Sequence, residues 1–272
     1  MRKALTIAAS DSGGACGIQA DIKTFSALGV YATSVITSVT AQNSVEMAET
    51  LDLPTEMVVS QARMVMQDIQ PEAVKVGMIG RATNYEALAD VFREHRPQYL
   101  VVDPVVTCYR GCSWVLSDEA IDRMIRCLLP LVDVFVPSIP DAEVILRTSI
   151  HNLDQMKRAV RQLKEFGPKW VVLKGGHLDG DPIDVIWNGS ELLELPGRRI
   201  ATSNDNGSGC AFSSAIAALL TRGLDVPDAV HQARAYMQGA LAAGFPVGRG
   251  KGPVHHFHNV WTEPAELYAQ EA

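Results

Sequence analysis

Apolar runs of strand length alternate with amphipathic segments of helix length along the chain, and this alternation constrains the fold more than any other feature. It is typical of a mostly parallel sheet with helices on its faces. The runs are rich in Val and Ile without strict polar alternation, which indicates strands that are buried on both faces. We expect strands at residues 4–9, 31–39, 73–78, 99–102, 132–136 and 170–173.

Two further features complete the expected architecture. The segment after Pro54 and the segment 212–220 carry apolar residues three and four positions apart, which predicts helices that pack on the sheet. The turn dipeptides Asp179-Gly180 and Asn188-Gly189 flank short apolar runs, which indicates an antiparallel edge. No linker or repeat divides the chain, so we expect residues 1–272 to form one α/β domain with a mostly parallel central sheet, helices on both faces and a small antiparallel edge.

Composition and charge argue against several classes of protein. The net charge is −7 and no basic stripe is present, so a nucleic-acid backbone would find little to bind. No apolar run approaches the roughly 20 residues that span a bilayer. The apolar stretch after Met1-Arg2-Lys3 is too short for an export signal. Five scattered cysteines, an odd number, favour free thiols in a reducing, cytoplasmic compartment.

Two groups of possible metal ligands carry little weight. Cys108 and Cys112 could begin a metal site, but no second matched pair of ligands accompanies them. His255, His256 and His258 alternate on a stretch that we expect to be irregular chain, where histidines are more often structural or exposed to solvent.

The sharpest local motif is Asn206-Gly207-Ser208-Gly209-Cys210, which we expect to follow a strand and to open a helix. Glycines let the backbone turn tightly with amides pointing outward, and a helix start adds about half a positive charge. Together they form an anion site that suits a phosphoryl group in transfer. An ordinary glycine-rich turn that caps a helix explains the pentapeptide equally well.

Three side chains near predicted strand or helix ends are candidates for the chemistry. Cys210 at a helix start would have a stabilised thiolate and could act as a base, although small buried packing is the commoner role of a lone cysteine. Lys174 could neutralise phosphate charge, or be a solvated lysine. Asp103 could hold magnesium through water, or cap a turn.

A second glycine-rich segment, 10–17, lies between a predicted strand and a predicted helix. It follows the carboxyl end of its strand, where open parallel sheets bind ligands. No Gly-Lys-Ser/Thr follows, so it is not a Walker loop, and its spacing fails the dinucleotide-binding pattern. The chain is therefore expected to be neither a P-loop ATPase nor a Rossmann dehydrogenase.

Taken together and in this order, the motifs resemble the ribokinase-like superfamily, and within it the hydroxymethylpyrimidine and hydroxymethylpyrimidine-phosphate kinases of thiamine biosynthesis. The resemblance covers nearly the whole chain. Its segments are 4–8, 17–21 with 23–29, 40–43, 74–78, 102–105, 174–177, 207–210 and 252–258.

The resemblance implies an ATP-dependent kinase that uses Mg²⁺ and forms a homodimer. It places Cys210 at the position of the catalytic base, Gly207, Ser208 and Gly209 at the anion hole, and Lys174 at the phosphate. Asn206 and Ser208 would contact the nucleotide, and Asp103 and Asp141 the metal. Around the pyrimidine it places Ala9, Asp21, Gln42, Val105 and Val106, of which Gln42 could read both donors and acceptors on the ring edge.

Departures from that family's pattern cluster near the chemistry. Its Asn-x-x-Glu motif is here Ser138-Ile139-Pro140-Asp141, its His before the anion hole is Asn206, and its Gly-Ala pair is Ala15-Cys16. A glycine beside the substrate is Ala9, and the segment 107–111 lacks the usual lysine. Because Asp141 is shorter than a glutamate, we expect weak binding of Mg-ATP.

Three functions stay open from the sequence. The first is a kinase of 4-amino-5-hydroxymethyl-2-methylpyrimidine, with or without activity on its monophosphate. The second is a pyridoxal or pyridoxine kinase, whose substrate is similar in size. The third is a non-catalytic relative that binds a pyrimidine, which the altered residues 138–141 favour and the presence of Lys174 and Cys210 disfavours.

Overall fold

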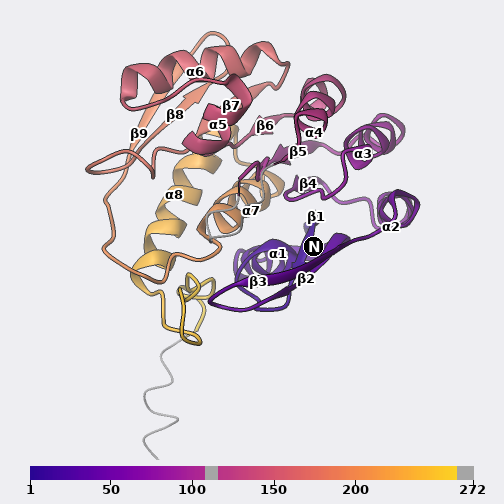
Figure 1. Cartoon of the computed structure of the whole chain (residues 1–272), viewed down its shortest axis with the longest axis horizontal. Helices are drawn as coiled ribbons and strands as arrows, with labels where there is room; N and C mark the ends of the chain where they lie inside the picture. Colours follow the sequence, from indigo (N-terminus) through magenta and orange to yellow (C-terminus); the bar gives the residue numbers. More distant parts are fainter. Residues whose placement is uncertain (108–115, 262–272) are drawn as a thin grey trace, which may run out of the picture.

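The structure, a computed structural model, describes residues 1–107 and 116–261. Within these residues one nine-stranded sheet runs through the molecule in the order β3-β2-β1-β4-β5-β6-β7-β8-β9, with helices on both faces (Figure 1). The strands are β1 (Lys3–Asp11), β2 (Tyr31–Gln42), β3 (Met47–Asp52), β4 (Ala73–Val76), β5 (Tyr99–Val102), β6 (Val134–Phe135), β7 (Trp170–Leu173), β8 (Ile183–Trp187) and β9 (Leu192–Pro196).

The central strands from β2 to β7 are parallel, as the apolar runs predict. β7, β8 and β9 pair antiparallel, which confirms the predicted edge. A second antiparallel edge, β2 with β3, was not expected from the sequence because β3 is mostly exposed and carries no apolar run. The strand expected directly before Asn206 is absent: β9 ends at Pro196, and residues 197–206 form no strand.

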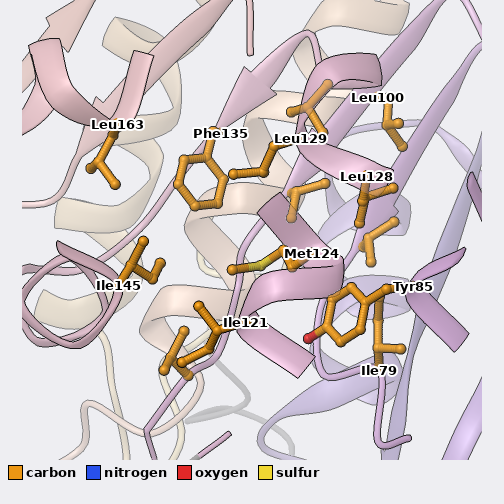
Figure 2. Packing of buried hydrophobic residues seen from close by; sticks show 14 of the residues in the cluster. Ile79, Tyr85, Leu100, Ile121, Met124, Leu128, Leu129, Phe135, Ile145 and Leu163 are labelled. Atoms are coloured by element: carbon orange, nitrogen blue, oxygen red, sulfur yellow. The ribbon is translucent and has the colours of Figure 1, made fainter. Parts of the chain in front are cut away.

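Two hydrophobic clusters cover the two faces of the sheet. One lies beneath the helices between residues 55 and 165 and includes Met124, Leu128 and Phe135 (Figure 2). The other lies beneath the helices at residues 17–27, 208–221 and 226–242. The helices are α1 (Gly17–Ala27), α2 (Thr55–Asp68), α3 (Thr83–Glu94), α4 (Asp118–Arg123), α5 (Ile139–Leu146), α6 (Leu153–Glu165), α7 (Ser208–Thr221) and α8 (Val226–Ala242).

Helix α7 is the most enclosed helix among the described residues, since every residue from Ala211 to Thr221 is buried. Only its first turn, Ser208 to Cys210, is partly exposed. The chain adds β2 on one side of β1 and β4 on the other, so β1 stands at a switch point of the sheet. Ligands of open α/β sheets bind at the carboxyl ends of strands at such a point.

None of the helices in the described part of the chain is both long and apolar enough to cross a membrane.

Candidate active site

The carboxyl ends of β5 and β7 place a carboxylate beside an ammonium group. Asp103 directly follows β5, and Lys174 directly follows β7. The Lys174 Nζ lies 2.9 Å from Asp103 Oδ1, and the Ser213 hydroxyl donates to Asp103 Oδ2 at 3.1 Å. Burial alone would lower the pKa of Lys174, but Asp103 and further acidic groups raise it overall. A charged lysine is therefore held at this edge of the sheet.

Helix α7 begins against this ion pair because its first residues are small. A Cβ atom at Gly209 would lie 3.5 Å from Lys174 Nζ. Gly207, which precedes the helix, has a φ of +79°, and a Cβ there would lie 1.8 Å from the Ala15 carbonyl oxygen. Only glycine fits at Gly207. The turn therefore brings the start of α7 next to both the lysine and the β1–α1 loop.

The start of α7 leaves backbone donors open. No side chain caps this helix, and the Ser208 amide donates to the Asp205 carbonyl. Among residues 1–107 and 116–261, no group accepts a hydrogen bond from the amides of Gly209 and Cys210. Two free amides, the helix dipole and the Lys174 ammonium group together form a site for an anion.

The other glycine-rich segment, in the β1–α1 loop, is closed by its own aspartate. The Asp11 carboxylate accepts hydrogen bonds from the amides of Gly13, Ala15 and Cys16 at 2.7–3.0 Å. The Gly14 amide donates to the Asp11 carbonyl. All four amides of this turn are thus satisfied inside the protein, and none is left for a phosphate.

The Cys210 thiol lies in the partly exposed first turn of α7, outside both hydrophobic clusters. The adjacent Cys16 side chain and the nearby Lys75 ammonium group lower its pKa, against the opposing effect of burial. A thiol with a lowered pKa at a helix start can hold or accept a proton. Cys210 therefore stays a candidate for the base.

A fully buried ion pair lies behind this thiol. The Lys75 Nζ lies 2.9 Å from Asp21 Oδ2, and both side chains are inaccessible to solvent. Hydroxyl groups of Thr6 and Ser214 also donate to the Asp21 carboxylate. Asp21, which the resemblance places beside the pyrimidine, is therefore enclosed by protein donors, and its carboxylate supports the site from within.

Lys75 is a buried charged residue beside the candidate site to which the sequence reasoning gave no role. Burial alone would lower its pKa, but Asp21, together with Cys210 and Asp103, holds the pKa above the ordinary value. Gly77 makes room for the ammonium group, since a Cβ there would lie 2.9 Å from Lys75 Nζ. A lysine inside a strand that is otherwise apolar and buried was the signal available in the sequence.

Asp141, the second metal candidate, has a different set of partners. Its Oδ2 accepts from the Ser138 amide and hydroxyl in a capping box at the start of α5. Its Oδ1 accepts from the Val106 amide at 2.9 Å. Both oxygens thus fasten the loop after β5 to α5, so the short carboxylate has a structural partner in place of a metal water. Asp103 is the carboxylate that remains a metal candidate.

The other predicted residues lie around the same edge. Ala9 is buried near the end of β1, and Gln42 ends β2, where Thr40 donates to its side-chain oxygen at 3.4 Å. Val105 has a φ of +41°, whereas the Val106 side chain is part of the buried core. The Asn206 side chain accepts from Cys16 Sγ at 2.8 Å.

The histidines near the C-terminus are structural in the described residues. His256 is buried, its pKa is lowered to about 4 by burial, and its carbonyl accepts from the Tyr236 hydroxyl. The His255 ring packs against Phe245 and Trp261. No cluster of three His, Cys, Asp or Glu suited to a metal occurs in the part of the chain that is described. Cys108, Cys112 and the altered segment 108–111 lie outside the described residues.

A cavity of about 200 Å³ adjoins the site. It lies between the β1–α1 loop, the β2–β3 turn and the segment 247–253, and Asn206 forms part of its wall. Asn43 and Ser44 line it from the turn, and Lys251 lines it from the opposite side. A small polar molecule could thus lie beside Asn206, just before α7.

Comparison with known proteins agrees with this geometry. The Phosphomethylpyrimidine kinase family matches residues 11–255. The chain belongs to this family. It is 42% identical over 264 residues to the hydroxymethylpyrimidine/phosphomethylpyrimidine kinase of Rhizobium meliloti. That alignment covers 96% of this chain and 98% of the relative. A thiamine biosynthesis bifunctional protein of Geobacter sulfurreducens is 38% identical, over 93% of this chain and 51% of its own length.

Solved structures give the same family and fold. A phosphomethylpyrimidine kinase from Clostridium difficile is 38% identical with a TM-score of 0.77, and the match covers 88% of this chain and 98% of that one. A Bacillus subtilis pyridoxal kinase in complex with ADP is 31% identical with a TM-score of 0.88, covering 94% and 97%. This member of the phosphomethylpyrimidine kinase family therefore has the ribokinase-like fold and is a phosphotransferase that acts on small molecules.

Proposed function

We propose that this kinase phosphorylates 4-amino-5-hydroxymethyl-2-methylpyrimidine and then the resulting monophosphate, as a step in thiamine biosynthesis. The observation that carries the proposal is the near full-length similarity to the Rhizobium meliloti kinase, whose name covers both steps. The site supports it, because the Lys174 ammonium group, the open amides at the start of α7 and the Cys210 thiol lie at the same edge of the sheet.

Each of these groups has a part in the proposed transfer. The Cys210 thiolate takes the proton from the attacking substrate hydroxyl, which is the role of a general base. The Lys174 ammonium group and the amides of Gly209 and Cys210 stabilise the negative charge that develops on the transferred phosphoryl group. The buried Lys75 acts through Cys210 by favouring its thiolate form.

Kinase membership implies ATP as the phosphoryl donor, and we assign its phosphates to the start of α7. Ser208 and Asn206 lie at the same turn and are proposed nucleotide contacts. A Mg²⁺ ion that accompanies a nucleotide usually keeps several waters and is held largely by the nucleotide phosphates. We assign Asp103 to those waters; the ion, when bound, neutralises charge on the phosphate oxygens.

We place the pyrimidine between Ala9, Gln42 and Val105, next to the 200 Å³ cavity. Gln42 has both a donor and an acceptor group to offer an aminopyrimidine edge. The hydroxymethyl group would then point toward Cys210.

Pyridoxal phosphorylation is the second candidate, because the Bacillus subtilis pyridoxal kinase structure has the higher TM-score, 0.88 against 0.77. Sequence identity favours the first, with 42% for the pyrimidine kinase of Rhizobium meliloti and 31% for that pyridoxal kinase. The two substrates are similar in ring size, so activity on both is a third outcome.

The test is an assay of ADP release with the hydroxymethylpyrimidine, its monophosphate and pyridoxine as separate acceptors. We expect the largest kcat/KM with the pyrimidine and a measurable rate with its monophosphate. A larger kcat/KM with pyridoxine would replace the proposal with the second candidate. Binding of the pyrimidine without any ADP release would instead identify a non-catalytic relative.

We further propose that the protein is a homodimer that works in the cytoplasm. Val39 and Leu51 form an exposed cross-strand pair on the β2–β3 edge, a surface that a second copy could cover. The described cysteines Cys127 and Cys210 are free thiols, which fits a reducing compartment. Sedimentation velocity on the parent and on a Val39→Lys, Leu51→Lys variant tests the dimer, and a monomeric parent would exclude it.

A further inference from the structure

The β1–α1 loop and the start of α7 bring two cysteines together. Cys16 is the N-cap residue of α1, and Cys210 lies in the first turn of α7. The two helix starts are in close contact, since a Cβ at Gly207 would lie 1.8 Å from the Ala15 carbonyl oxygen and 3.7 Å from the Cys16 Cα. The Cys16 side chain lies near enough to the Cys210 thiol to lower its pKa.

Both thiols have surroundings that favour reaction over inert packing. Each cysteine residue is partly exposed and lies outside the two hydrophobic clusters. Each lies at a helix N-terminus, where amides and the helix dipole stabilise a thiolate. Cys16 Sγ also lies 2.8 Å from Asn206 Oδ1, so its side chain is directed toward the turn that carries Cys210.

We propose that Cys16 and Cys210 form a redox-active dithiol, which an oxidant of the peroxide class converts into an intramolecular disulfide that switches the kinase off. Because the two helix starts pack against each other, the two sulfurs can approach to the S–S bond length of about 2.05 Å. Cys16 is thereby a resolving thiol for Cys210, a role separate from phosphoryl transfer. Transient disulfides of this kind are the usual type in reducing compartments.

The oxidation proceeds in two balanced steps. The Cys210 thiolate attacks one peroxide oxygen, the O–O bond breaks, and a sulfenic acid and a hydroxide ion form; the hydroxide takes a proton and leaves as water. The Cys16 sulfur, after losing its proton, then attacks the Cys210 sulfur. The S–S bond forms, the S–O bond breaks, and the departing hydroxide takes the proton to become a second water. Two thiols supply the two electrons that reduce one peroxide.

The disulfide removes the thiolate that we assign as general base, so inhibition rests on the proposed function, whereas formation of the bond does not. Loss of a general base typically lowers turnover by about 10²-fold or more. A thiol reductant such as dithiothreitol reverses the reaction and restores the thiolate.

The experiment treats the purified full-length enzyme with hydrogen peroxide, alkylates the remaining thiols, and maps disulfides by peptide mass spectrometry. We expect one peptide pair joined through Cys16 and Cys210, a loss of turnover of about 10²-fold, and full recovery with dithiothreitol. A Cys127→Ala variant serves as the matched control, because Cys127 lies on the far helical segment of residues 124–128, and it should behave as the parent does.

A Cys16→Ala variant supplies the decisive arm. Without a resolving thiol, peroxide should still inactivate the enzyme, but Cys210 should proceed to sulfinic acid, which dithiothreitol does not reduce. A Cys16→Ser variant repeats the test if the alanine variant does not fold. Full recovery of the Cys16 variants with dithiothreitol, or Cys210 joined to Cys108 or Cys112 in the parent, would overturn the proposal. A Cys16–Cys210 disulfide that leaves turnover unchanged would support the proposed dithiol and contradict the base role of Cys210.

Discussion

The two glycine-rich turns of this kinase look alike in sequence but differ in what their amides bind. In the β1–α1 loop the Asp11 side chain and carbonyl accept from the four amides of residues 13–16. At the start of α7 the amides of Gly209 and Cys210 have no acceptor within the described residues. We therefore expect an anion at the open turn, where a cation lies nearby, and not at the turn that an internal carboxylate closes.

The two turns nevertheless depend on each other. Gly207 packs against Ala15, and Cys16 lies near Cys210. The open turn therefore packs directly on the closed turn. Substitutions in the open turn should therefore change turnover, and substitutions in the closed turn should change the free energy of unfolding.

The largest expected effect is that of Cys210→Ala. Removing a general base lowers turnover by about 10²–10⁴-fold, while the thermal midpoint should change little, because the thiol lies outside the hydrophobic clusters. Steady-state kinetics with the pyrimidine and a thermal melt measure the two quantities, with Cys127→Ala as the matched control. A folded Cys210→Ala enzyme with parental turnover would remove the thiol from the mechanism.

Lys174→Ala should come next. Losing one preorganised charge contact typically raises the barrier by about 3 kcal/mol, which is roughly 10²-fold in kcat. Affinity for the unphosphorylated pyrimidine should fall far less. Lys169→Ala is the control, since Lys169 pairs with Asp133 and its side chain is 70% exposed. If only pyrimidine affinity fell in Lys174→Ala, the lysine would belong to the substrate pocket.

Sequence reasoning reached the parallel sheet, the β7–β9 edge and the group of Asp103, Lys174 and Cys210, because these depend on apolar runs and on the rule that parallel strands end at one edge. It did not find β3, which is an exposed edge strand without an apolar pattern. Such strands form through pairing with a neighbour, here β2, and the local sequence predicts that pairing poorly.

The roles of three carboxylates were also beyond the sequence. Asp21, Asp141 and Asp11 lie in or beside the motifs that we interpret as ligand sites, and each accepts hydrogen bonds from protein groups. Which partner a carboxylate finds depends on tertiary contacts such as Lys75 with Asp21 across two elements. The short Ser138–Asp141 pair is a local capping box, so its spacing could have been recognised as a helix start.

In the closed turn, Asp11→Asn should lower stability. The change removes the charge from three hydrogen bonds and sets an amide group where only acceptors fit, which should reduce the free energy of unfolding by about 2 kcal/mol. Urea denaturation measures this, with Asp118→Asn as the control, because the Asp118 side chain is 87% exposed. The KM for ATP should stay at the parental value. A large rise in that KM with parental stability would mean that the first turn binds phosphate.

The smallest effect concerns the pH profile. The base is active as a thiolate, so turnover should fall as pH drops through the Cys210 pKa, which lies below that of an ordinary thiol of about 8.5. The adjacent Cys16 side chain is the main cause of this lowering, so Cys16→Ala should move the acid limb of kcat to higher pH. An acid limb that stays in place or moves to lower pH would contradict the assigned contact.

Amide chemical shifts of the labelled kinase during titration with a non-hydrolysable ATP analogue and Mg²⁺ test the central claim most directly. Amides that begin to donate to a phosphate move downfield, so we predict the largest downfield shifts at Gly209 and Cys210. The amides of Gly13, Ala15 and Cys16 already donate to Asp11 and should shift much less. Larger downfield shifts at Gly13, Ala15 and Cys16 than at Gly209 and Cys210 would contradict the account.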